Sequence, residues 1–422
     1  LLNEGYTMEV YITLYTSIMR QIETVKTVET TFINSEEKDV TKLIDNIIMT
    51  AIEKRASDIH IEPMEDKVRI RYRIDGILIT VSEISKYRQG VIAGRIKAIS
   101  NMHQELTSDQ DGSINTYENY SIRVSSQKNV NGEKFVLRLL KKNTEAKNLF
   151  ELGFPNNPEL IERAFQQKNS MVLVCAPTGG GKTTTLYSVL EYLDRPEINI
   201  ISIENPVERR IPGINQIEIG KSITFESALR TVVRQDPDII LVGEIRDLDT
   251  AKIAIEAGQT GHLVLSTIHT IDAIEAITRL RKMGISDYDV SATLITSISQ
   301  RLVRRLCPHC KKQHVLNDEE KKYIERVEKL TKVNFDLKAC ETYEPVGCAT
   351  CNYTGYYERI ALYEVLCLDE YLKDMISDGK SSIDIRKYAM EKTDYKPLIV
   401  DGVKKVLNGI TTVEELKRNI LI

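Results

Sequence analysis

The feature that most constrains the fold is a glycine-rich turn between an apolar run and a helical segment. The run Met171-Val172-Leu173-Val174-Cys175 is apolar throughout, which is typical of a strand buried on both faces of a parallel sheet. The turn then reads Ala176-Pro177-Thr178-Gly179-Gly180-Gly181-Lys182-Thr183 and leads into the helical segment. In such a turn, backbone N–H groups point inward at a helix N-terminus and surround a phosphate. The sequence therefore predicts a phosphate-binding loop in an α/β domain.

Two side chains of this loop carry specific chemistry. Lys182 supplies positive charge for the β- and γ-phosphates of a nucleotide, and the Thr183 hydroxyl can ligate Mg²⁺. Ala176 stands where the usual pattern has its first glycine. We therefore expect ATP and Mg²⁺ as cofactors. The expected nucleotide contacts are Pro177, Thr178, Gly179, Gly180, Gly181, Lys182, Thr183 and Thr184.

Similar apolar runs recur at residues 198–203, 239–242 and 263–267, with helical stretches between them. Strand–helix alternation of this kind predicts a doubly wound α/β domain over about 155–300. Ligands of such sheets lie beyond the carboxyl ends of the strands. Glu244 follows the run 239–242 and is therefore placed to reach Mg²⁺ through a water molecule. A solvent-exposed loop acid is the alternative.

A pair of carboxylates follows another of these runs. Glu204 and Glu208 come after residues 198–203. Two carboxylates at one such edge could orient and activate a water molecule. From the spacing alone, a helix-capping or surface pair remains the alternative.

A small α+β domain is expected before the phosphate loop. Apolar and basic residues alternate from Val68 to Ile74, and Asp75-Gly76 then separates them from a second apolar run, which predicts a β-hairpin. Asn131-Gly132 marks a second hairpin in the same way. The expected elements are a helix over 39–54, strands over 68–74 and 77–81, a helix over 91–102, and strands over 120–124 and 135–140.

The run Gly153-Phe154-Pro155-Asn156-Asn157-Pro158 is rich in turn-forming residues and predicts a linker. The chain does not begin with methionine, which leaves open that its N-terminal part is truncated. The predicted parts are an N-terminal segment 1–39, a small domain 40–145, a linker 146–158, a phosphate-loop core 159–300, a cysteine module 301–360 and a helical C-terminal region 361–422.

Two C-x₂-C pairs predict a metal site. Cys307 and Cys310 form the first pair, and Cys348 and Cys351 form the second. Four thiolates suit a tetrahedral structural Zn²⁺, so we expect zinc as a further cofactor. The two pairs are separated by 37 intervening residues, which a helical excursion over 318–332 would explain. Among the remaining cysteines, Cys175 and Cys367 are expected to be buried small hydrophobic residues.

Composition and charge narrow the function classes. Seven cysteines in 422 residues favour a reduced, cytosolic chain over a disulfide framework. Lys and Arg number 57 against 61 Asp and Glu, which argues against a general nucleic-acid or anionic-membrane binder. No apolar run reaches the roughly 20 residues of a transmembrane helix, and the first residues lack the pattern of a signal peptide. We expect no nucleic-acid partner and no membrane insertion.

Several segments together resemble a known family. Ala176–Thr183, Glu204–Glu208, Gly243–Asp247 and Gly261–Thr270 look, in this order, like the four ATPase boxes of the secretion ATPase superfamily. Ser57–Pro63, together with Gln110-Asp111-Gly112, resembles the second N-terminal domain of that family. The resemblance covers about residues 40–420 and implies a RecA-like P-loop ATPase core with a sheet rich in parallel strands. Many pilus-extension and type II secretion members of the family carry the tetracysteine module.

The resemblance assigns roles to individual residues. Glu244 becomes the acid beside the metal ion, and Glu208 becomes the general base or water-orienting group, with Glu204 in support. His262 and His269 fall in the histidine box, which lies near the nucleotide; a purely structural role is the alternative for His269.

The arginines are assigned in the same way. Arg123 and Arg138 match arginines that approach the γ-phosphate, where they would stabilise the charge of the transferring group; a solvated sheet face is the alternative. Arg246 is expected to form an ion pair. The basic run Arg301, Arg304 and Arg305 is expected to be a solvated or interdomain face.

This chain departs from the family pattern at a few positions. Asn205 stands where aspartate is usual, and residues 106–109 lack the basic residues that commonly precede Gln-Asp-Gly. Gln127 replaces a proline and Glu358 replaces a glycine.

The resemblance implies a cytoplasmic, Mg²⁺-dependent motor ATPase that powers assembly of type IV pili or type II secretion pseudopili. It would act as a homo-hexamer on an inner-membrane platform protein and associated cytoplasmic assembly proteins, and these partners would hold it at the inner membrane. A nucleic-acid translocase or DNA-uptake motor on the same core is one alternative, which the near-neutral charge disfavours. An ATP-gated regulator with negligible turnover is another, against which Glu208 and Glu244 argue.

Overall fold

The computed structural model describes residue 33 and residues 37–105, 109–142, 147–220, 222–338 and 340–420. Most of the expected N-terminal segment 1–39 and part of the departing segment 106–109 therefore lie outside the described residues. The chain divides into two compact units, residues 1–141 and residues 142–422. Each unit is described by itself.

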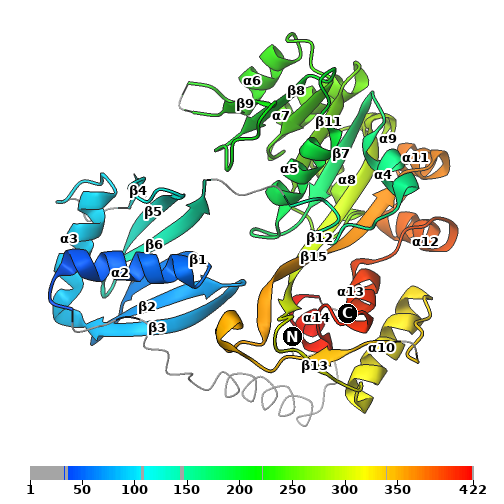
Figure 1. Ribbon diagram of the computed structural model, residues 1–422. Helices are drawn as coiled ribbons and strands as arrows, with labels where there is room; N and C mark the ends of the chain where they lie inside the picture. Colours follow the sequence, from blue (N-terminus) through cyan, green and yellow to red (C-terminus); the bar gives the residue numbers. More distant parts are fainter. Residues whose placement is uncertain are drawn as a thin grey trace, which may run out of the picture. The chain divides into compact units, whose positions relative to one another are not determined.

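The described residues of the first unit form an antiparallel sheet with two α-helices (Figure 1). In chain order its elements are α2 (Val40–Glu53), β1 (Ala56–Pro63), β2 (Lys67–Ile74), β3 (Ile77–Ser85), the 3₁₀ helix η1 (Lys86–Arg88), α3 (Gln89–Ile99), β4 (Gln110–Ile114), β5 (Tyr120–Asn129) and β6 (Gly132–Lys141). The six strands lie in the order β3-β2-β1-β6-β5-β4. Both predicted hairpins and both predicted helices are confirmed, whereas β1 and β4 were not predicted.

Side-chain alternation sets the two faces of this sheet. On β2, Val68, Ile70, Tyr72 and Ile74 are buried in the core of the unit, and the arginines between them point to the other face. Helix α2 packs on the core face through residues such as Ile47 and Ile48. The Tyr72 hydroxyl reaches the carbonyl of Ile47 at 2.6 Å, which ties the helix to the sheet.

The second unit is built on a larger sheet. Its elements up to residue 306 are α4 (Pro158–Phe165), β7 (Ser170–Cys175), α5 (Lys182–Leu193), β8 (Ile200–Glu204), β9 (Asn215–Glu218), α6 (Phe225–Val232), β10 (Ile239–Val242), α7 (Leu248–Gln259), β11 (Leu263–Ile268), α8 (Glu275–Met283), α9 (Asp287–Thr293) and β12 (Leu294–Leu306). They are followed by β13 (Lys312–Gln313), α10 (Asp318–Thr331), β14 (Tyr343–Glu344), the 3₁₀ helix η2 (Ala349–Cys351), β15 (Tyr356–Cys367), α11 (Glu370–Ser377), α12 (Ser382–Lys392), α13 (Leu398–Leu407) and α14 (Val413–Asn419).

The seven strands of this sheet lie in the order β15-β12-β7-β11-β10-β8-β9. All neighbours are parallel except β15, which pairs antiparallel with β12. The predicted strands appear as β7, β8, β10 and β11. Strands β9, β12 and β15 were not predicted, and β12 runs across residue 300, where the phosphate-loop core was predicted to end.

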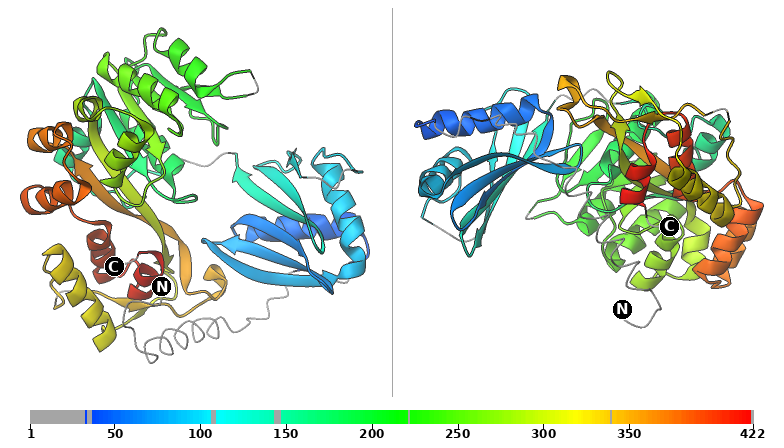
Figure 2. Two further views of the ribbon diagram at one scale, coloured as in Figure 1. Left: turned by 180° about the vertical axis from the view of Figure 1, so that it is seen from behind. Right: turned by 90° about the horizontal axis from the view of Figure 1, so that it is seen from below.

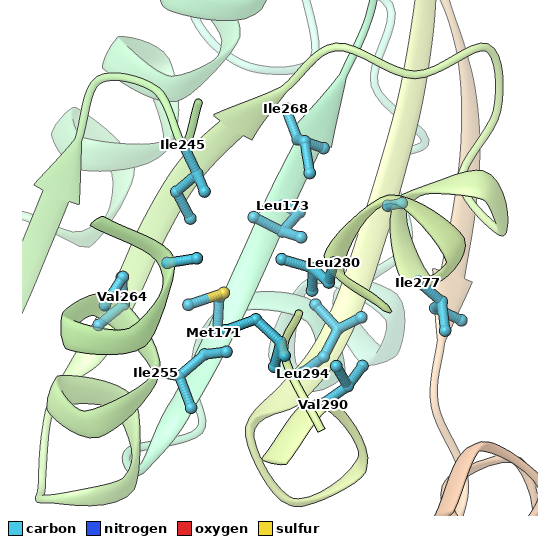
Figure 3. Packing of buried hydrophobic residues seen from close by; sticks show 14 of the residues in the cluster. Met171, Leu173, Ile245, Ile255, Val264, Ile268, Ile277, Leu280, Val290 and Leu294 are labelled. Carbon is cyan, nitrogen blue, oxygen red and sulfur yellow. The ribbon is translucent and has the colours of Figure 1, made fainter. Parts of the chain in front are cut away.

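Both faces of this sheet are covered. Met171 and Leu173 of β7 lie on the face of α7 and α8, as Figure 3 shows beside Ile255 and Leu280. Val172 and Val174 face the other way, into a core that includes residues of α4 and α5. Burial on both faces explains why β7 is apolar throughout, as a central parallel strand should be.

The segment 147–157 belongs to the second unit, although a linker was expected there. Leu149 and Phe154 are 1% and 3% exposed and lie in the core beside α4 and α5. The carbonyl oxygen of Leu152 accepts a hydrogen bond from the Ala361 N–H of β15 at 3.1 Å. The stretch of turn-forming residues is therefore packed onto the sheet edge.

The ends of β12 and β15 carry a further small core with α10, α13 and α14 (Figure 2). Val303 and Leu362 of the two strands contribute to it, as do Ile324 of α10, Val403 of α13 and Leu416 of α14. The predicted helical excursion between the cysteine pairs is confirmed as α10. Within the described residues, no helix combines the length and the apolar character that a bilayer span requires.

Candidate functional site

The phosphate loop connects β7 to α5. Gly181 caps α5 with a left-handed φ of 84°, and Gly179 also has a positive φ, 75°. A Cβ atom on Gly180 would lie 2.6 Å from the Cβ of Ala176, so this position has no room for a side chain. Gly180 is further fixed because the Gln300 amide donates to its carbonyl at 2.6 Å. The loop therefore presents its backbone at the N-terminus of α5, where helix dipole and unpaired N–H groups favour an anion.

A pocket of about 180 Å³ opens beside this loop. The polar side chains that line it include Lys182, Thr183, Glu208, Glu244 and His269. They come from the first turn of α5 and from the carboxyl ends of β8, β10 and β11. Parallel strands bring these ends to one edge, so residues more than 80 positions apart in the sequence share one cavity.

Glu204 lies at the end of β8 and is held by several donors. It is 3% exposed. The Tyr187 hydroxyl and the Ser202 hydroxyl, the latter at 2.7 Å, donate to its carboxylate, and the Gln216 amide donates at 3.2 Å. The same Tyr187 oxygen accepts the Glu208 backbone N–H at 3.3 Å. Glu204 therefore fixes the turn that carries Glu208, and Glu208 itself is exposed to the pocket.

Glu244 follows β10 and lies between two basic side chains. Arg246 Nη2 lies 2.5 Å from one of its oxygens, and His269 Nε2 lies 3.8 Å from the other. The ion pair that was expected for Arg246 is thus present. The turn is fixed by β11, because the Thr267 hydroxyl donates to the Gly243 carbonyl at 2.8 Å.

The electrostatics of the pocket disfavour additional positive charge. Burial lowers the pKa of Lys182, while Glu244 opposes that shift. Burial, with a contribution from Lys182, also lowers the pKa of His269. The Lys182 ammonium donates to the carbonyl oxygens of Ala176 and Pro177 at 2.9 and 3.4 Å. These carbonyl groups carry only partial negative charge, so an anionic ligand would compensate the Lys182 charge more fully.

The structure does not bring His262 to this pocket. His262 precedes β11, whereas His269 follows it. The Nδ1 atom of His262 lies 2.8 Å from the carbonyl oxygen of Ala257 at the end of α7. The two histidines of the box therefore lie at opposite ends of one strand.

Arg123 and Arg138 lie in the first unit, opposite each other on β5 and β6. Arg138 Nε donates to Asp58 at 3.0 Å, yet its side chain remains 62% exposed. The neighbouring arginines of β2 are held more completely, since Arg69 and Arg71 both bind Glu62. The role of Arg123 and Arg138 near a γ-phosphate stays a prediction.

The four predicted metal ligands lie together. The thiol sulfur atoms of Cys307, Cys310, Cys348 and Cys351 all lie within 4.8 Å of one another. Three of the separations are 3.8 to 3.9 Å, close to the spacing of about 3.8 Å that a tetrahedron with Zn–S bonds of about 2.3 Å requires. Backbone N–H groups of Gly347 and Gly355 point at two of the sulfur atoms at 3.3 Å.

Such N–H groups stabilise thiolates. The pKa of Cys348 is lowered to about 6, chiefly by the backbone N–H of Cys351, whereas burial raises the pKa of Cys310 to about 12. The donor set and its spacing fit a structural Zn²⁺. Cys340 lies elsewhere, with its thiol directed at the Leu337 carbonyl, and Cys175 and Cys367 are buried as predicted.

Sequence reasoning missed two supporting residues. Tyr187 holds both Glu204 and the backbone of Glu208, and Gln300 holds the phosphate loop. No motif marks either residue. Each acts across elements, and only the sheet order, in which β12 lies beside β7, makes the Gln300 contact possible.

Residues 34–418 match the family described as type II/IV secretion system proteins. The chain belongs to this family. It is 41% identical over 388 residues to the type IV pilus assembly ATPase PilB of Thermus thermophilus, a match that covers 90% of this chain and 43% of that protein. It is 38% identical over 395 residues to the type II secretion system ATPase E of Vibrio cholerae, covering 91% of this chain and 76% of that protein. This chain thus spans less than half the length of the Thermus relative.

A solved structure agrees with this membership. The pilus retraction motor PilT with bound ADP is 25% identical to this chain, with a TM-score of 0.58, and the match covers 88% of this chain and 95% of PilT. The predicted fold class, a RecA-like core preceded by a small α+β domain, is confirmed, as is the resemblance to the secretion ATPase superfamily.

Proposed function

We propose that this chain is the motor part of a Mg²⁺-dependent ATPase that powers assembly of type IV pili or type II secretion pseudopili. The observation that carries the proposal is the single pocket lined by Lys182, Thr183, Glu208, Glu244 and His269. The names of the relatives support it, since pilus assembly and type II secretion ATPases both match over about nine tenths of this chain.

In this proposal each side chain has one task. Lys182 exchanges its bonds to the loop carbonyls for bonds to phosphate oxygens. Thr183, and Glu244 through water, would hold Mg²⁺, which when bound neutralises charge that develops on the phosphates. Glu208 orients the attacking water and accepts its proton, and the bonds that hold Glu204 keep Glu208 in place.

The motor would be a homo-hexamer that turns hydrolysis into movement of an inner-membrane platform protein, together with cytoplasmic assembly proteins. It would therefore act in the cytoplasm at the inner membrane. ATP would favour one arrangement of the two units over another, and hydrolysis would release that preference.

The test compares two pocket variants with matched surface variants. Lys182→Ala should lower phosphate release by roughly 10²–10³-fold or more, because its charge on the phosphates is lost. Glu208→Gln should bind a fluorescent ATP analogue like the unchanged protein but turn over very slowly, because an amide cannot accept the proton. Lys252→Ala and Glu256→Gln, both exposed on α7, should keep full turnover.

The proposal has a clear failure. If Glu208→Gln hydrolyses ATP at the unchanged rate, Glu208 is not the base. If Lys182→Ala and Lys252→Ala are equally active, the pocket is not the site of hydrolysis.

A further inference from the structure

The segment that follows β11 runs away from the pocket and is held by hydrogen bonds and an ion pair from distant parts of the second unit. It begins at His269, which lines the pocket. Two residues later, the Ile271 carbonyl accepts hydrogen bonds from Arg301 at 2.6 Å and from Ser299 at 3.4 Å, both on β12. Arg301, expected on a solvated or interdomain face, is thus bound to this segment instead.

The next two residues are held by the C-terminal part of the chain. Asp272 pairs with Arg386 of α12 at 2.8 Å, and its other oxygen caps α8 through the backbone N–H groups of Ile274 and Glu275. The Ala273 N–H donates to Glu364 of β15 at 3.0 Å. The histidine segment is therefore tied directly to β15 and α12.

Glu364 lies at the centre of these contacts. It is 3% exposed, and burial raises its pKa. Besides the Ala273 N–H, its carboxylate accepts the Tyr395 hydroxyl at 2.8 Å and the Leu398 N–H at 3.0 Å. One side chain thus joins the segment beyond His269 to the connection between α12 and α13.

Stability alone is a weak reason for this arrangement. Taking a carboxylate out of water costs free energy that its partners only roughly repay, and an apolar residue of similar size often stabilises a core equally well. A buried carboxylate whose partners lie on two separate connections can do something that an apolar residue cannot do. It makes the position of one connection depend on the position of the other.

The α12–α13 connection has room to respond. Thr393, Asp394, Tyr395 and Lys396 line an open cavity of about 250 Å³. Residues of α4, among them Leu160 and Arg163, also line this cavity. Because the Tyr395 hydroxyl donates to Glu364 of β15 at 2.8 Å, movement of this connection toward that space would change the contact with Glu364.

We propose that Glu364 is a positioning residue that couples the histidine segment 269–273 to the α12–α13 connection 393–398. Nucleotide binding at the pocket would shift His269 and its segment, and Glu364 would carry the shift to the C-terminal helices. Asp272 and Arg386 form a second link in the same direction, and Arg386 also reaches the Tyr395 hydroxyl at 3.3 Å. This inference rests on the proposed nucleotide site.

Amide hydrogen exchange of the full chain tests the coupling, with and without ADP or a non-hydrolysable ATP analogue and Mg²⁺. In the unchanged protein, nucleotide should alter exchange in the loop 178–184, in 269–273 and in 393–398. In Glu364→Gln, the amide NH₂ group would face the Leu398 N–H, donor against donor. The response should remain in the first two segments and be lost in 393–398. The nucleotide-dependent change in exchange rate that disappears there should be roughly tenfold, the size expected for the loss of about one net hydrogen bond.

Two variants separate coupling from simple destabilisation. Tyr395→Phe removes one donor to Glu364 without burying a new polar group, and should weaken the response of 393–398. Glu415→Gln changes another buried carboxylate, which binds Arg304 of β12 and lies 2% exposed. It should lower the melting temperature as Glu364→Gln does, yet leave the nucleotide response of 393–398 intact.

The outcomes distinguish this inference from the proposed function. If nucleotide alters 178–184 in the unchanged protein but never alters 393–398, there is no coupling and the inference is wrong. It is equally wrong if Glu364→Gln keeps the full response of 393–398. If nucleotide alters none of the three segments, the proposed nucleotide site itself fails.

Discussion

At the scale of single residues, the charged groups of the pocket shift one another's pKa values. Lys182 and His269 both have lowered pKa values, with burial as the main cause in each. Glu244 supplies negative charge to both, and it is also paired with Arg246. These two basic side chains of the pocket therefore share one acidic neighbour, Glu244.

A carboxylate in the first unit gives a prediction on pH. Glu62 is bound by Arg69, Arg71 and Lys134. Burial alone would raise its pKa, but the hydrogen bonds from these cations outweigh burial and lower it from 4.5 to about 2. A carboxylate with a lowered pKa in the folded state stabilises the fold above its unfolded pKa. This stabilisation should be present at pH 7 and be lost as the pH falls from about 4.5 towards 2.

Thermal melts of the unchanged protein and of Glu62→Gln between pH 7 and pH 3 check this. The variant should melt lower at pH 7, and the difference between the two proteins should shrink as the pH falls. Glu83→Gln is the matched control, because Glu83 forms a more exposed pair with Lys67 and should have little effect. A difference that stays constant across this pH range would contradict the assignment.

At the scale of elements, the parts that sequence predicts best are those whose signal is local. The strand β7, its glycine turn and the first turn of α5 form one continuous pattern, and the C-x₂-C pairs form another. Glu208 and Glu244 could be placed near Lys182 because the carboxyl ends of parallel strands meet, and the family resemblance added His269. Strand β9 lies at the sheet edge and has one apolar residue, the half-buried Ile217. It therefore carries no such local pattern.

Other elements escaped prediction because their environment is made by distant residues. Strand β12 contains Gln300 and several arginines, which in sequence suggest a solvated segment. In the structure Arg304 pairs with Glu415 and lies over the Tyr356 ring at 3.8 Å, so the charge is satisfied within the fold. The role of Glu364 also depends on partners at 273, 395 and 398, which no local pattern connects.

The cysteine cluster gives a prediction for the element that it closes. Zinc should be present at one ion per chain, because four thiolates leave no open position. Cys310→Ser should lose the ion and lower the melting temperature, since a structural metal stabilises the fold that forms its site. Binding of nucleotide should change little, because the pocket lies at β7, β8, β10 and β11 and not at the cluster.

Cys340→Ser is the matched control, because Cys340 lies between the pairs in sequence but outside the cluster. It should keep both the zinc and the melting temperature. Elemental analysis and thiol titration under native conditions give the readout. Protein that contains no zinc and whose four cluster thiols are all freely reactive would rule out the structural zinc site.

At the scale of the whole molecule, the residues predicted to act in hydrolysis belong to two units. The pocket described here belongs entirely to the second unit, whereas the candidate arginines Arg123 and Arg138 belong to the first. Leu149 is anchored in the core of the second unit, so only a few residues connect the two units. Closure of the first unit over the core of the same chain stays a prediction, which the exchange of subunits below tests.

The last prediction asks which chain supplies the arginine. Arg138→Ala should lower turnover by about 10³-fold or more while ATP affinity changes little, because the arginine acts on charge that develops during transfer. Lys67→Ala, also in the first unit but paired with Glu83 at the exposed edge, should leave turnover unchanged. Oligomers mixed from Arg138→Ala and Lys182→Ala chains then decide between the two arrangements. If the arginine acts within its own chain, every mixed site lacks one essential group and turnover stays absent.

If a neighbouring chain supplies the arginine, a site with an intact Lys182 receives an intact Arg138. Substantial turnover then returns in the mixed oligomers, and this result would overturn closure within one chain.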